Sequence, residues 1–229
     1  MVAAGIDGVY SYAGRTEAPL PQPLPTRVGS FGGIPGLVKY LHGQAVTHVI
    51  DATHPFAAQM STNAVAACAQ TGIPLLALER LAWIATDEDQ WTHVPDVAAA
   101  VTALPDHPSR IFLAIGRQSL ADFAAKPEHQ YLLRLVDAPN ALPLPNVEVT
   151  VSRGPFTVDA DLALLKIHRI QMIVSKNSGG SGAAAKLEAA RILKLPVLMI
   201  ERPIVPDRPR VQTATEILAW LGHRADLGA

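Results

Sequence analysis

The sequence predicts an α/β protein of two similar lobes, each built on a mostly parallel sheet. Short apolar runs alternate with helix-like segments along the 229 residues, and strands joined through helices pair in parallel with right-handed crossovers. A weak internal repeat indicates two lobes, because Gly-Ile-Pro-Leu-Leu-Ala-Leu-Glu-Arg (72–80) matches Lys-Leu-Pro-Val-Leu-Met-Ile-Glu-Arg (194–202). We expect the hinge at residues 104–110, which gives lobes of residues 1–106 and 107–229.

In the first lobe, residues 1–5 are typical of a helix end that stops at a glycine. Four prolines in residues 18–25 exclude regular structure there. The expected strands are 9–13, 47–50 and 73–78, and the expected helices begin near residue 34 and span 57–70 and 95–104. Thr53 is the expected N-cap of the helix at 57–70, with Pro55 in its first turn and Gly72 as its stop.

The second lobe repeats this alternation. Apolar runs predict strands at 110–115, 131–136, 147–151 and 171–174, and amphipathic segments predict helices at 159–168 and 183–195. In open parallel sheets, ligands bind at the carboxyl ends of strands. We therefore expect a cleft lined by the polar segments that follow three strands, residues 51–54, 116–117 and 175–178.

Composition excludes several classes of protein. With 19 basic and 20 acidic side chains, the chain has no global field that would favour nucleic acid or an anionic membrane. No apolar run approaches the roughly 20 residues of a membrane span, and the N-terminus lacks a signal-peptide pattern, so we expect a cytoplasmic protein. The single cysteine, Cys68, excludes an internal disulfide and a cysteine-based metal site. It lies on the apolar face of a predicted helix and should be a core residue, and we expect no bound metal.

Residues 175–182 (Ser-Lys-Asn-Ser-Gly-Gly-Ser-Gly) lie between a predicted strand and a predicted helix. Their glycines allow a close backbone approach, and the N–H groups at the start of the helix would attract an anion. Ser175, Lys176, Ser178 and Lys186 add further donors, which suits carboxylates or phosphates. The alternative is a tight turn with no ligand, and the spacing does not match a Walker loop.

Two other polar segments allow more than one interpretation. Asp51 and His54 have the spacing of an acid–base pair, but a strand-end Asp can equally form a turn and a His before Pro can cap a helix. Arg153-Gly-Pro-Phe156 is consistent with a turn or with an anion clamp. Neither segment by itself names a reaction.

Taken together, five motifs resemble those of the precorrin-6A reductase family of cobalamin biosynthesis. They are Ser11-Tyr-Ala-Gly-Arg15-Thr16, Val28-Gly-Ser-Phe-Gly-Gly33, Val49-Ile-Asp-Ala-Thr-His-Pro-Phe-Ala57, Arg153-Gly-Pro-Phe156, and Ser175-Lys-Asn-Ser-Gly-Gly180 with Lys186. Their order and spacing extend over essentially the whole chain. The resemblance implies two Rossmann-like lobes, NADPH as hydride donor, and reduction of one double bond of the precorrin-6A macrocycle to give precorrin-6B. Close relatives in the anaerobic route use a cobalt-containing substrate.

The resemblance also implies roles for individual residues. The cofactor-binding set is Ser11, Arg15 and Thr16 at the adenosine ribose and its 2′-phosphate, Phe31, Gly32 and Gly33 in a permissive turn, and Thr53, His54 and Pro55 near the nicotinamide. The substrate-binding set is Arg117, Arg153, Ser175, Lys176, Ser178, Gly179, Gly180 and Lys186. Lys176 and His54 are the candidate catalytic residues. The tetrapyrrole is the expected partner of a monomer that passes its product to the next pathway enzyme.

One departure concerns the start of the chain. The family normally opens with a strand and a glycine-rich loop that receives the cofactor pyrophosphate, and here that first β-α unit is missing. We therefore expect the DNA upstream of the Met1 codon to encode it in frame. Alternatives from other classes are a two-lobe small-molecule binding protein without redox activity and a transferase that holds a nucleotide sugar.

Overall fold

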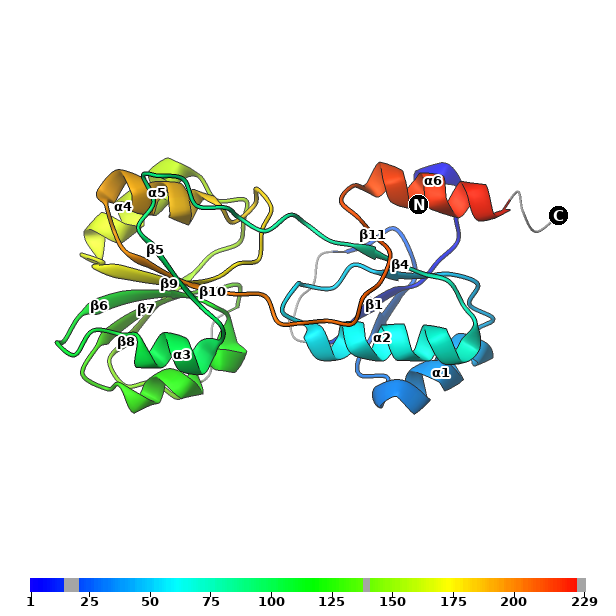
Figure 1. Ribbon diagram of the computed structural model, residues 1–229, viewed down its shortest axis with the longest axis horizontal. Helices are drawn as coiled ribbons and strands as arrows, with labels where there is room; N and C mark the ends of the chain where they lie inside the picture. Colours follow the sequence, from blue (N-terminus) through cyan, green and yellow to red (C-terminus); the bar gives the residue numbers. More distant parts are fainter. Residues whose placement is uncertain (15–20, 138–140, 226–229) are drawn as a thin grey trace. The chain divides into compact units, whose positions relative to one another are not determined.

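The computed structural model describes residues 1–14, 21–137 and 141–225 and confirms the α/β class (Figure 1). The chain forms two units. The first combines Met1–Arg80 with Ile204–Ala229, and the second is Leu81–Pro203. This division differs from the predicted boundary at 106/107. The chain leaves the first unit after residue 80 and returns to it after residue 203, so the second unit is an insertion.

The second unit contains a six-stranded sheet in the order β5-β10-β9-β6-β7-β8, and every pairing is parallel. Its strands are β5 (Trp91–Val94), β6 (Arg110–Ala114), β7 (Gln130–Leu135), β8 (Val147–Val151), β9 (Met172–Lys176) and β10 (Val197–Ile200). Helices α4 (Val158–Ile167) and α5 (Ala185–Leu193) cover one face, and α3 (Val97–Thr102) lies on the other (Figure 1). Short helical turns follow β6 at η2 (Arg117–Ser119) and η3 (Ala121–Ala125).

Burial of apolar side chains holds these layers together. Phe112, Leu132, Ile173 and Met199 from four neighbouring strands pack against Leu187 of α5, each at most 4% exposed. Strands buried on both faces read as nearly continuous apolar runs, which explains why the sequence predicts most of this sheet. The predicted strands do not include β10, or the edge strand β5, whose segment Trp-Thr-His-Val alternates apolar and polar residues.

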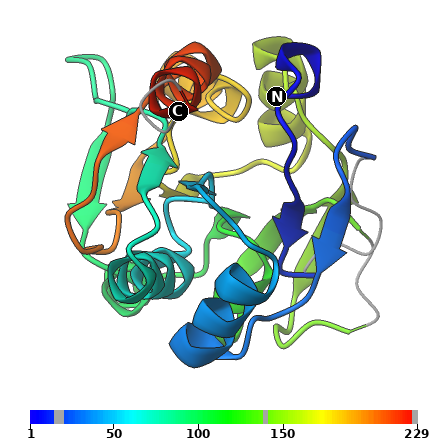
Figure 2. The same ribbon diagram turned by 90° about the vertical axis from the view of Figure 1, so that its right-hand side faces the viewer.

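The first unit contains two smaller parallel sheets. Strand β1 (Tyr10–Tyr12) pairs with β2 (Thr26–Val28), and Figure 2 shows them as adjacent blue arrows. The second sheet has the order β11-β4-β3, from Arg210–Val211, Leu75–Leu78 and Val49–Asp51. The remaining elements are η1 (Val2–Ala4), α1 (Gly33–Gly43), α2 (Ala58–Thr71) and α6 (Ala214–Ala225).

Helices α1 and α2 enclose the core of the first unit. Leu37 and Leu41 of α1 pack with Ala64, Ala67 and Cys68 of α2. Cys68 is 5% exposed, and its burial, assisted by the nearby Asp51 carboxylate, raises the pKa of its thiol to about 11. The prediction of a core cysteine is confirmed. No helix in the described part of the chain is both long enough and apolar enough to cross a membrane.

Candidate functional site

The carboxyl ends of four neighbouring strands in the second unit bring together three of the four cationic residues assigned to the substrate. Lys176 ends β9, Arg117 follows β6, and Arg153 follows β8. Asp137 lies between them because it follows β7. Parallel strands carry their carboxyl ends to one edge of the sheet, so residues far apart in the sequence become neighbours.

Asp137 links Arg117 and Arg153, and Lys176 binds Ser119. The Lys176 ammonium donates to Ser119 Oγ at 3.1 Å. Arg117 donates to the Asp137 carbonyl at 2.5 Å, and Arg153 pairs with the Asp137 carboxylate at 3.2 Å. Ser119 and Asp137 belong to none of the predicted sites. Both follow predicted strands, and this position was the available signal.

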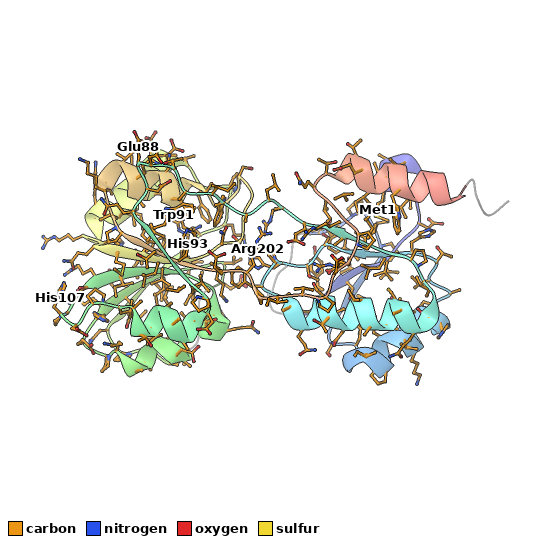
Figure 3. The ribbon with its side chains drawn as sticks, in the orientation of Figure 1. Met1, Glu88, Trp91, His93, His107 and Arg202 are labelled. Carbon is orange, nitrogen blue, oxygen red and sulfur yellow. The ribbon has the colours of Figure 1, made fainter. Side chains whose placement is uncertain are left out.

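The glycine-rich loop after β9 has the backbone that its sequence suggests. Gly179 and Gly180 have φ angles of 68° and 78°, a region that disfavours residues with a Cβ. Three of its carbonyl groups accept hydrogen bonds from side chains elsewhere in the second unit. Arg202, labelled in Figure 3, donates to the Asn177 carbonyl at 2.9 Å and to the Ser178 carbonyl at 3.3 Å, while the Trp83 indole donates to the Gly180 carbonyl at 2.8 Å.

The loop's N–H groups have fewer partners than its carbonyls. Within the described residues, the N–H groups of Gly179, Gly180 and Ser181 meet no protein acceptor. Successive unpaired N–H groups near the start of a helix are typical of loops that bind anions. Lys176 directly precedes this loop, so a carboxylate is the expected ligand.

Two predicted ligands of the loop have different surroundings. Ser175 is 0% exposed, and its hydroxyl donates to the Lys176 carbonyl at 3.3 Å. Lys186 is only 6% exposed; its ammonium donates to the Ala183 carbonyl at 2.6 Å and lies 4.5 Å from the centre of a Trp83 ring. Both side chains therefore support the loop's backbone from within the second unit.

Burial is the main reason that the pKa of Lys186 falls from 10.5 to about 8, with the Asp161 carboxylate opposing the shift. In the unfolded chain the side chain keeps its ordinary pKa. Between these values the unfolded state binds more protons, so stability should increase with pH. This contribution is complete above pH 10.5 and is lost as the pH falls through about 8.

We expect the free energy of unfolding to rise by on the order of 1–3 kcal/mol between pH 8 and 10 on account of Lys186. Denaturant titrations across this range should show a flatter profile for Lys186→Met. Lys166→Met is the matched control, because Lys166 is exposed on α4. Identical slopes for Lys186→Met and wild type would contradict the assignment.

In the first unit, Arg27 organises the turn before α1. Its guanidinium donates to the Gly29 and Ser30 carbonyls, both at 2.6 Å, and to Ser11 Oγ at 3.3 Å. It also lies 3.8 Å from the centre of the Phe31 ring. Three of the residues assigned to the cofactor, Phe31, Gly32 and Gly33, follow in this turn, whereas Arg15 and Thr16 lie outside the described residues.

Glycine is required at this turn for two different reasons. Gly32 and Gly33 have φ angles of 82° and 76°, which confirms the expected permissive backbone. Gly36, inside α1, serves a different purpose: a Cβ there would lie 1.7 Å from the Phe31 carbonyl oxygen. The turn can fold over the first turn of the helix only because Gly36 has no side chain.

Gly36→Ala should therefore displace the Phe31–Gly33 turn and lower stability by about 1–3 kcal/mol through overpacking. Gly43→Ala is the control, because that helical position has nothing within 4 Å of a built Cβ. Alanine there should be neutral or slightly stabilising, since glycine is the weaker helix former. Thermal unfolding of both variants measures the difference, and equal melting temperatures would show that the turn adapts.

The Asp51–His54 pair does not form. The Asp51 carboxylate is buried, accepts from the Thr53 N–H and hydroxyl at 3.2 and 2.7 Å, and pairs with Arg208 at 3.4 Å. His54 is exposed, and its Nδ1 accepts the Phe56 N–H at 3.2 Å.

The prediction that Thr53 is the N-cap of α2 is also wrong. Ala57 occupies that position, and Thr53 instead lies 3.1 Å from Ser61 Oγ. Pro55 precedes the helix, which begins at Ala58. Thr53, His54 and Pro55 nevertheless lie where expected, directly after β3. Among the described residues, no group of three or more His, Cys, Asp or Glu side chains is placed to hold a metal ion.

Comparison with known proteins places the chain in a family. The family model described as precorrin-6x reductase CbiJ/CobK matches residues 1–222. The precorrin-6A reductase of Rhodobacter capsulatus is 60% identical over 98% of this chain and 89% of that protein. The cobalt-precorrin-6A reductase of Priestia megaterium is 32% identical over 80% of this chain and 75% of that protein. A solved structure of CobK precorrin-6A reductase matches with a TM-score of 0.90 at 61% identity, over 96% of this chain and 87% of that one. The chain belongs to the precorrin-6x reductase family.

Proposed function

We propose that this protein reduces one double bond of the precorrin-6A macrocycle, giving precorrin-6B in cobalamin biosynthesis. The observation that supports this most directly is the cationic strand-end site of the second unit, built from Lys176, Arg117, Arg153 and the loop amides. A corrin precursor carries many acetate and propionate carboxylates. Such a ligand needs cations and N–H groups close to its carboxylates. Because the net charge of the chain is nearly balanced, these cations must be clustered at the site.

NADPH is the proposed reductant, and the first unit is its proposed binding unit. Built Cβ atoms on Gly29 and Gly32 would meet nothing within 4 Å, so the backbone before α1 has open space beside it. Together with Ser11, Phe31 and the start of α1, this turn fits a nucleotide phosphate. The cofactor supplies the hydride, while this chain's residues bind and orient the two reactants.

Reduction of a carbon–carbon double bond also needs a proton. Lys176 is the proposed proton donor or ring-orienting residue, because its ammonium lies at the strand-end site and is held by Ser119. His54 is the second proposed catalytic residue, and we place it near the nicotinamide by its position after β3. Its ring is exposed to solvent.

Sequence identity favours the metal-free substrate over its cobalt-containing counterpart. The relative that acts on precorrin-6A is 60% identical, whereas the one that acts on cobalt-precorrin-6A is 32% identical. The test is direct. Purified protein should consume NADPH, followed by nicotinamide absorbance, only when precorrin-6A is added, and precorrin-6B should appear in equal amount. Unchanged absorbance with intact substrate would favour the binding-protein alternative.

Cofactor choice tests the role proposed for Arg15. Arg15→Ala should weaken NADPH by about 10- to 150-fold, the loss of a charge-assisted contact to phosphate, and should affect NADH much less. Fluorescence titration with both cofactors measures the difference. Arg210→Ala, at an exposed position of β11 in the same unit, is the control. Equal losses for NADPH and NADH in Arg15→Ala would move the phosphate contact to another residue.

A further inference from the structure

Trp83 lies outside every motif singled out in the sequence, yet it holds the glycine-rich loop at several points. It lies in the short segment that enters the second unit before β5. Its indole N–H donates to the Gly180 carbonyl at 2.8 Å. Its backbone N–H donates to Asn177 Oδ1 at 2.8 Å, and its carbonyl accepts from Asn177 Nδ2 at 3.1 Å. The Asn177 amide thus satisfies both backbone groups of Trp83.

The segment that carries Trp83 also lies against the loop. A Cβ on Gly179 would come within 1.9 Å of the Leu81 carbonyl oxygen and 2.6 Å of an Arg202 nitrogen. Gly179 therefore fits between two groups that only a glycine could approach so closely. The Trp83 ring extends this contact to Lys186, whose ammonium holds the Ala183 carbonyl at 2.6 Å.

These contacts occupy the carbonyls of the loop and not its amides. Trp83 and Arg202 donate to the Gly180, Asn177 and Ser178 carbonyls, whereas the Gly179–Ser181 amides have no protein acceptor among the described residues. An anion site is effective when its donors are already aimed before the ligand arrives, because no reorganisation is then needed on binding.

We propose that Trp83, acting with Asn177, is a positioning residue that holds the glycine-rich loop with its amides and Lys176 directed at a carboxylate of the substrate. The proposal rests on the proposed function for the identity of that substrate. The indole bond to Gly180 is the part of this arrangement that one substitution can remove while an aromatic ring is kept.

The test compares Trp83→Phe with Trp91→Phe. Trp91, labelled on β5 in Figure 3, is the matched control because its buried indole N–H has no hydrogen-bond partner among the described residues. Both variants exchange indole for phenyl in the second unit. Only Trp83→Phe should lower kcat/KM for precorrin-6A, by about 2- to 12-fold, the range for one neutral hydrogen bond, with the KM for NADPH unchanged.

Amide hydrogen exchange supplies a readout that does not depend on activity. The Asn177 N–H donates to the Ile200 carbonyl and the Ser178 N–H to the Lys176 carbonyl. Both amides should exchange faster in Trp83→Phe and at wild-type rates in Trp91→Phe. Asn177→Asp removes the donor to the Trp83 carbonyl but keeps the acceptor, so it should show the same direction of change with Trp83 in place.

Wild-type exchange and turnover in Trp83→Phe would overturn the proposal, as would equal effects in Trp91→Phe, which would indicate a general loss of aromatic volume. If Trp83→Phe fails to fold, Asn177→Asp decides by the same two measurements. If the wild-type protein does not reduce precorrin-6A, the proposed function fails. Exchange at Asn177 and Ser178 still decides whether Trp83 holds the loop.

Discussion

Gly179→Val is expected to lower kcat/KM for precorrin-6A by at least about 100-fold, which corresponds to roughly 2.7 kcal/mol. Two independent obstacles act at this position. A φ of 68° is strained for any residue with a Cβ and most for a β-branched one. The Cβ would also lie 1.9 Å from the Leu81 carbonyl oxygen, so the loop or the segment at Leu81 must move. Either movement removes the amides from the proposed anion site.

Gly182→Ala in the same loop is the matched control, because nothing lies within 4 Å of its built Cβ and its φ is not positive. It should keep wild-type turnover and wild-type NADPH affinity. Steady-state kinetics and circular dichroism on both variants separate a local defect from unfolding. Wild-type turnover in Gly179→Val would reduce the loop to a connection without a ligand.

Lys176→Ala is the second large expected effect, a fall of about 10- to 150-fold in kcat/KM, because a charge-assisted contact to a substrate carboxylate is lost. Folding and NADPH affinity should remain nearly intact, because the ammonium lies at the carboxyl edge of the sheet, where it donates to Ser119. The division between KM and kcat is informative. A higher KM alone indicates uniform binding, whereas a lower kcat indicates that Lys176 orients the ring or supplies the proton.

Lys166→Ala controls for the loss of a lysine in the same unit, and an exposed residue of this kind should change stability by less than about 0.5 kcal/mol. Activity of that variant should equal wild type. If Lys176→Ala also turns over like wild type, Lys176 leaves the site, and Arg117 and Arg153 become the remaining cations at the strand ends.

The cationic strand-end site was predictable because it needs only strand positions and parallel pairing. Apolar runs before Arg117, Arg153 and Lys176 identify three strands, and parallel sheets bring their carboxyl ends to one edge. The contacts that shape the loop were not predictable. Trp83 and Asn177 meet across 94 residues of sequence, and neither has a local pattern that indicates the other.

The Asp51–His54 hypothesis failed for a related reason. Spacing alone suggested a pair, but Arg208, from the returning part of the chain, competes for the carboxylate. The two compact units divide after residues 80 and 203, not at 106/107, and the sequence holds a signal for these points. The two repeated segments end in Glu79-Arg80 and Glu201-Arg202, next to the two points where the chain crosses between units. A repeat of this kind marks the points where the chain leaves a sheet, and it also indicates similar lobes.

The inserted second unit has a consequence for synthesis on the ribosome. Residues 81–203 are contiguous, so their sheet has all its strands as soon as β10 has emerged. At that point the first unit still lacks two elements, α6 and β11, and β11 pairs with β4. A nascent chain from which β10 has emerged but β11 has not would carry a complete second unit and an incomplete first unit, with the edge of β4 that pairs with β11 still unpaired.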